Sequence, residues 1–189
     1  SLRAAMDSGK VVLVNLAEGD CGLLHELTHV LMDADFPDAP LWLQEGLATL
    51  HESSGLSTCD GHADATASAG APAAARAEQT RNLVPRHNWR LAVLRRAVAE
   101  NRLPSLNDLV TESPFRGPGE ALDFAYARYF CWFLHDRGEL QPLYVKLRAR
   151  SAADPTGAET LREVLDNREW ESINRDFRIW LAAAVSRPS

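Results

Sequence analysis

The sequence predicts a mainly helical α+β fold, with a small N-terminal β element and a helical C-terminal half. Residues 11–14, Val-Val-Leu-Val, form an apolar β-branched run that is typical of a short strand. From residue 88 almost to the end, apolar residues recur close to the 3.6-residue period of a helix. The 189 residues are enough for a single domain with a buried core.

Two helices are expected between the strand and residue 52. The first is predicted over residues 21–34, with Asp20 as its cap. Two prolines within residues 36–40 end this helix. The second helix is predicted over residues 41–52, with Pro40 near its first turn.

Residues 53–80 have a different composition, dominated by Ala, Ser, Gly and Thr, with almost no large apolar side chain. Such a stretch predicts a flexible surface loop. Its place after the second helix leaves two interpretations open, a flap over a neighbouring cleft or a disordered insertion.

Residues 81–189 are expected to form a helical subdomain. Ser105 and Asp108 have the spacing of a capping box, and Gly138 is a typical stop for the helix before it. The helices are expected over residues 88–101, after Ser105, and over 120–137, 140–150, 158–165 and 169–185.

Composition narrows the possible functions. The net charge is -6, and a mildly acidic chain without clustered Lys or Arg gives no footprint for nucleic acid. No apolar stretch is long enough to span a membrane, and residues 1–6 do not read as a signal peptide.

The three cysteines, Cys21, Cys59 and Cys131, include no C-x-x-C pair. This argues against a cysteine zinc site, and the odd number argues against a complete disulfide framework. Cys131 lies in an apolar helical stretch, where it is expected to be a small buried hydrophobic residue.

The segment His25-Glu26-Leu27-Thr28-His29 carries explicit chemistry. Histidines at positions i and i+4 lie one turn apart on the same helix face, so both imidazoles can converge on one metal ion. Glu26 projects beside that ion, where a carboxylate can act as general base toward water. The competing interpretation is a pair of hydrogen-bonded core histidines with no metal.

A catalytic zinc site needs three protein ligands and one open position. Glu45 lies on the second helix, which a short proline-containing connection can fold back against the first. Gly46 beside it permits close helix approach. We therefore expect Glu45 to be the third ligand, with Asp33, Asp35 and Asp38 as the alternatives.

Three segments together resemble the gluzincin metallopeptidases, particularly the bacterial peptidase-MA-like group. They are H-E-L-T-H at residues 25–29, W-L-Q-E-G-L-A-T-L-H-E at 42–52 and Y-A-R-Y-F at 126–130. The resemblance implies one zincin-like catalytic domain over residues 1–189. Residues 1–52 would hold the strand and the metal-binding helices, ahead of the 53–80 loop and the helical subdomain.

The resemblance also implies roles for individual residues. His25, His29 and Glu45 would bind Zn²⁺, and Glu26 would be the catalytic base. Tyr126 is the first candidate to donate a hydrogen bond to the oxyanion, or else it is an ordinary core tyrosine. The other candidates for this donor are Tyr129, His87 and His135.

Thr49 and Glu52 are candidates for orienting the ligating imidazoles, because they follow Glu45 by one and two turns. Similar aminopeptidases carry an acid at the second of these positions. However, residues 14–18 lack the Gly-x-Met-Glu-Asn segment of that branch, so aminopeptidase activity is not implied.

The function expected from the resemblance is a zinc metallopeptidase, a hydrolase that cleaves within peptide or protein substrates. Residues 11–16 would offer an edge strand to an extended substrate. The alternative is a zinc-binding interaction or regulatory domain that no longer catalyses. The resemblance favours a bacterial periplasmic or secreted protein. Gluzincins usually carry a larger sheet before the metal helix, so an N-terminal portion is expected to be missing or reduced.

Overall fold

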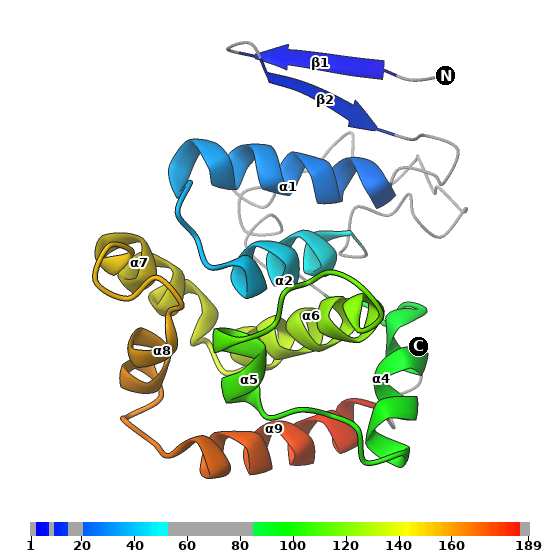
Figure 1. The fold of residues 1–189 in the computed structure, drawn as a ribbon, viewed down its shortest axis with the longest axis vertical. Helices are drawn as coiled ribbons and strands as arrows, with labels where there is room; N and C mark the ends of the chain where they lie inside the picture. The colour runs from blue at the N-terminus through cyan, green and yellow to red at the C-terminus, as the bar shows by residue number, and fades with distance from the viewer. Residues whose placement is uncertain (1–2, 8–9, 15–20, 53–84, 186–189) are drawn as a thin grey trace, which may run out of the picture.

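The computed structural model describes residues 3–7, 10–14, 21–52 and 85–185, and it describes the first two ranges by their backbone alone (Figure 1). Its helices are α1 (Cys21–Asp35), α2 (Leu41–His51), α4 (Arg90–Ala99), α5 (Leu106–Thr111), α6 (Glu120–Asp136), α7 (Leu140–Arg150), α8 (Ala158–Val164) and α9 (Trp170–Val185).

The α+β class predicted from the sequence is wrong, and the fold is mostly α. From Cys21 onward, the part of the chain that the structure describes is 69% helix and contains no strand or sheet. Ahead of it, β1 (Arg3–Asp7) and β2 (Lys10–Val14) pair antiparallel as a two-stranded hairpin, whose second strand lies next to α1. A two-stranded hairpin is marginally stable by itself, so the helices from Cys21 onward determine the fold class of the described chain.

The predicted helices are confirmed, with their bounds shifted by one or two residues. Helix α1 ends at Asp35 and α2 begins after Pro40, as the two prolines indicated. Ser105 and Asp108 form the reciprocal capping box at the start of α5. Gly138, just after α6, has a φ of 71°, a left-handed conformation that glycine adopts at little cost.

The core is organised around α6. Its central residues, from Ala125 to Leu134, are all buried, and α2, α4 and α9 pack against it (Figure 1). Trp42 of α2 meets Phe130 of α6 with ring centroids 5.7 Å apart, and Phe177 of α9 contacts the same ring at 5.9 Å. Cys131 is fully buried in this layer, as predicted.

Two predicted features, the Asp20 cap and the 53–80 loop, lie outside the described residues. Within the described ranges, no helix is both long and apolar enough to cross a membrane.

Candidate metal centre

Helices α1 and α2 bring His25, His29 and Glu45 together. The two histidines lie one turn apart on α1, and the Pro-containing connection folds α2 back beneath them (Figure 1). The Nε2 atoms of His25 and His29 are 3.1 Å apart. Glu45 Oε2 lies 3.7 Å from the first of these nitrogens and 3.5 Å from the second.

These separations fit one tetrahedral metal ion. Two ligand atoms that each stand about 2.0–2.1 Å from a tetrahedral zinc ion are roughly 3.3–3.4 Å from one another. The three separations in the structure are 3.1, 3.5 and 3.7 Å, so one is slightly shorter than that range and two are slightly longer. Two imidazole nitrogens and one carboxylate oxygen also form the donor set of many catalytic zinc sites, although the same set binds other divalent metals.

The carboxylate of Glu45 gives a second indication of a metal site. Its Oε2 atom is buried and has no hydrogen-bond partner among the described residues. A buried carboxylate oxygen without a partner is costly, and coordination of a metal ion is one way to satisfy it. Because this oxygen is also the one that faces both histidines, the orphaned atom and the three-donor geometry point to the same place.

The two histidines differ in their electrostatic surroundings. Burial lowers the pKa of His25, and the neighbouring His29 lowers it further. The Glu45 carboxylate facing His29 raises the pKa of that imidazole, against the opposing effect of its burial. Metal binding requires both rings to be neutral, so protons compete with a metal ion mainly at His29.

Glu26 lies between the two histidines in sequence and is partly buried. Its carboxylate is close enough to raise the pKa of both imidazoles, although it is not one of the three convergent donors. It therefore stands beside the centre rather than in it, which is the arrangement that the sequence predicts for a base.

The two residues expected to orient the imidazoles make different contacts in the structure. The carboxylate of Glu52 is 3.9 Å from Nδ1 of His25. In contrast, the hydroxyl of Thr49 donates to the backbone carbonyls of Glu45, at 2.6 Å, and Gly46, at 3.2 Å. Thr49 is fully buried and bonded within its own helix, so its predicted role toward an imidazole is replaced by a local one.

Tyr126 is not brought to the metal centre. Its side chain is fully buried, and its hydroxyl donates to the carbonyl of Pro104 at 3.1 Å. Its ring packs against Phe177, with centroids 5.4 Å apart, and burial raises its pKa. These contacts belong to a core tyrosine, the alternative that the sequence left open.

Two further candidates from the sequence, Tyr129 and Asp35, contact residues other than the His–Glu cluster. Tyr129 is fully buried, and its hydroxyl lies 3.2 Å from Nδ1 of His87. Asp35 accepts a hydrogen bond from Tyr144 at 2.8 Å and pairs with Arg148. Among the described residues, the group able to hold a metal contains none of the three candidate aspartates.

Arg90 is a participant that sequence reasoning missed. Its Nη1 donates to Glu52 Oε2 at 2.7 Å, so it reaches the edge of the metal centre from α4. An arginine in the first turn of a helix gives no sequence signal for such a contact.

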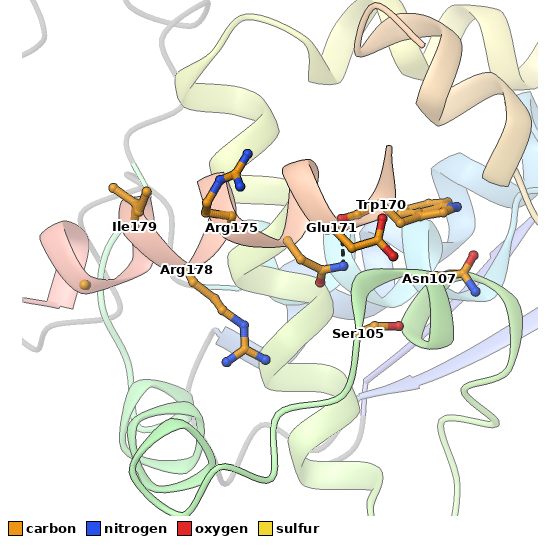
Figure 2. Close-up of a pocket in the computed structure, with 9 residues that line it drawn as sticks. Ser105, Asn107, Trp170, Glu171, Arg175, Arg178 and Ile179 are labelled. Carbon is orange, nitrogen blue, oxygen red and sulfur yellow. Dashed lines mark hydrogen bonds between the residues drawn. The ribbon is translucent and has the colours of Figure 1, made fainter. Parts of the chain in front are cut away.

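A separate pocket lies between α5 and α9 (Figure 2). Figure 2 shows Arg175, Arg178 and Ile179 of α9 on one side and Ser105 at the start of α5 on the other. None of the residues that line it belongs to the His–Glu cluster. The concave surface and the candidate metal centre are thus different features of the described structure.

Comparison with known proteins gave no match to a family model, a curated protein or a solved structure.

Proposed function

We propose that this chain is a zinc-dependent metallopeptidase that hydrolyses peptide bonds within peptide or protein substrates. The observation that carries the proposal is the convergence of His25, His29 and Glu45 at separations suited to one tetrahedral ion, with Glu26 beside them. A purely structural metal site would not need that extra carboxylate. The resemblance to gluzincins, carried by residues 25–29 and 42–52, supports the peptidase assignment.

Different residues of the chain would bind the metal and transfer the proton. Nε2 of His25 and His29 and Oε2 of Glu45 would hold the metal, and three protein ligands are the number typical of catalytic zinc sites. When bound, zinc polarises a carbonyl group and lowers the pKa of a coordinated water toward about 7. Glu26 would accept a proton from the attacking water and deliver it to the leaving amine as the peptide bond breaks.

Tyr126 would not supply the hydrogen bond to the oxyanion that acts beside the metal. Its hydroxyl already serves the Pro104 carbonyl within the core. A substrate oxygen at the metal centre would have to compete with that buried bond.

The decisive experiment compares the wild-type chain with Glu26→Gln. Zinc content is measured after metal loading and desalting, and hydrolysis is followed with an unstructured protein substrate by release of new amino termini. We expect both proteins to hold about one zinc ion per chain. Wild type should cleave, and Glu26→Gln should lose a factor of about 100 or more, because general-base catalysis contributes on that scale. Glu112→Gln, at an exposed position after α5, is the matched control and should keep full activity.

The possible outcomes separate the competing interpretations. Equal hydrolysis by wild type and Glu26→Gln would show that Glu26 is not the general base. Zinc binding without hydrolysis in the wild type would favour a non-catalytic interaction or regulatory domain. No zinc uptake by the wild type would reject the metal centre altogether and leave His25 and His29 as hydrogen-bonded histidines.

A further inference from the structure

We infer that Arg90 and Glu52 act together as positioning residues for the metal ligand His25. This inference rests on the proposed metal centre and extends it to α4, which contributes no ligand. One oxygen atom makes the connection: Glu52 Oε2 accepts a hydrogen bond from Arg90 at 2.7 Å and lies 3.9 Å from Nδ1 of His25.

The two nitrogens of His25 face different carboxylates. Nε2 points to the convergent cluster, 3.7 Å from Glu45, whereas Nδ1 faces Glu52. A carboxylate next to Nδ1 favours the tautomer with its proton on that nitrogen, which leaves the Nε2 lone pair for a metal. The 3.9 Å separation is about 1 Å longer than a hydrogen bond, so Glu52 acts here through its charge and closes on Nδ1 with a small side-chain shift.

Arg90 keeps the Glu52 carboxylate in place. Charge-assisted bonds between guanidinium and carboxylate groups are among the stronger hydrogen bonds in proteins. Both side chains are largely shielded, with 11% of Arg90 and 16% of Glu52 exposed, so solvent screens this pair less than a surface pair. Without Arg90, the carboxylate could turn away from Nδ1.

Arg90 is itself fixed at the first residue of α4. Its backbone N–H donates to the Asn88 side chain at 3.1 Å, and its guanidinium lies over the Trp89 ring, 4.5 Å from the ring centroid. The first contact holds the backbone of Arg90, and the second holds its guanidinium. The orientation of His25 therefore depends on the seating of α4 as well as on α1 and α2.

The test measures zinc affinity of the full chain by competition with a chromophoric chelator. We expect Glu52→Gln and Arg90→Ala each to weaken zinc binding about tenfold or more, the usual effect of removing a partner of a ligating histidine. Arg90→Lys keeps the charge but loses the planar fork, and it should fall between Arg90→Ala and wild type. Arg96→Ala is the matched control, because Arg96 is an exposed residue of α4 paired with Glu100, and it should leave the affinity unchanged.

A double-mutant cycle tests whether the two residues act as one unit. If Arg90 works through Glu52, then Arg90→Ala should cost little further affinity in a Glu52→Gln background. Unchanged affinity in both Glu52→Gln and Arg90→Lys would overturn the inference, as would full additivity in the cycle. An unfolding curve of each metal-free variant shows whether that variant is folded. If Arg90→Ala is not folded, the test rests on Arg90→Lys and Glu52→Gln.

A metal-free measurement keeps this inference separate from the proposed function. Long-range proton–nitrogen NMR spectra report the tautomer of the His25 ring in the apo protein at neutral pH. We expect the Nδ1–H form in wild type and a mixture in Glu52→Gln and Arg90→Ala. The same mixture in all three proteins contradicts the positioning role even if zinc binds, whereas failure of zinc uptake alone counts against the proposed function.

Discussion

The sulfur atom of Cys131 lies 2.5 Å from the position that a Cβ atom would take on Gly46. The backbone oxygen of Ala127 is 2.9 Å from the same position. Helices α2 and α6 are therefore in backbone contact at Gly46, which directly follows the candidate ligand Glu45. The sequence predicted a close approach at Gly46, and the structure directs it toward α6.

Gly46→Ala is expected to destabilise the protein and weaken its metal site. A methyl group at this position must push the two helices apart, and overpacking of this kind costs about 1–3 kcal/mol of unfolding free energy. The shift would carry Glu45 away from the histidines. Urea unfolding and zinc competition measure the two effects.

Two further variants control that prediction. Gly22→Ala, on α1, meets no atom of the described residues within 4 Å, so it should stabilise the chain by about 0.5–1 kcal/mol through helix propensity. Cys131→Ala in the Gly46→Ala background should recover part of the loss, because the Ala127 oxygen remains in the way. Equal effects of Gly46→Ala and Gly22→Ala would show that packing against α6 is unimportant.

Tyr126→Phe is expected to lower stability without changing zinc affinity or peptide hydrolysis. The change leaves the Pro104 carbonyl without its donor, at a cost of about 1 kcal/mol. Thermal unfolding, zinc competition and steady-state hydrolysis provide the measurements. A large fall in turnover with normal stability would restore the catalytic role suggested by the sequence.

Removal of metal is expected to lower the thermal midpoint of unfolding. A ligand that binds only the folded state stabilises it by roughly 4 kcal/mol when present at about 1,000 times its dissociation constant. Calorimetry with zinc and with chelator should show this difference in the wild type. His29→Ala removes one of the three donors, so its two curves should coincide.

Acidification is expected to destabilise the metal-free protein through His51. Burial lowers the pKa of this imidazole below its ordinary value of 6.5, despite its hydrogen bond to the Leu47 carbonyl. The unfolded chain therefore binds the proton more readily, so the stabilisation is complete above pH 6.5 and is lost as the pH falls toward the folded pKa. Urea unfolding with chelator at about pH 7.5 and 5.5 should show a smaller decrease for His51→Asn than for wild type.

The Cys131 thiol is expected to be unreactive in the folded protein. Burial raises its pKa, and only the thiolate is an effective nucleophile. In a chain that carries Cys21→Ser and Cys59→Ser, a thiol reagent should modify Cys131 only at the rate of unfolding or local opening. Rapid modification under native conditions would contradict the burial found here.

The convergence of the two histidines and Glu45 could be predicted because short-range rules place these residues. The spacing of His25 and His29 puts both rings on one helix face, and a short connection with two prolines limits where Glu45 can lie. The helix bounds could be predicted for the same reason, because caps, prolines and periodicity act over only a few residues. The same reasoning led to a wrong class, because an apolar β-branched run favours a strand without showing that other strands exist to form a layer.

The contacts around the centre could not be predicted in the same way. Glu52 and Arg90 are far apart in the chain, and no periodic rule selects which cation meets which carboxylate. The orientation of Tyr126 depends on which face of α6 packs against α9, because its ring contacts Phe177 of that helix. Such choices are set by tertiary packing, which a single sequence does not display.

The helices that carry the donors are anchored very unequally. Most of α2 is buried, whereas Met32 is the one residue of α1 in the core among its described side chains. We expect backbone amides of apo α1 to exchange with deuterium much faster than those of α2, because local opening is easiest where few apolar contacts are lost. Metal release and detachment of α1 would then be a single event. The lifetime of the metal-bound state would then depend on how fast α1 opens, and the bound ion would hold α1 against α2.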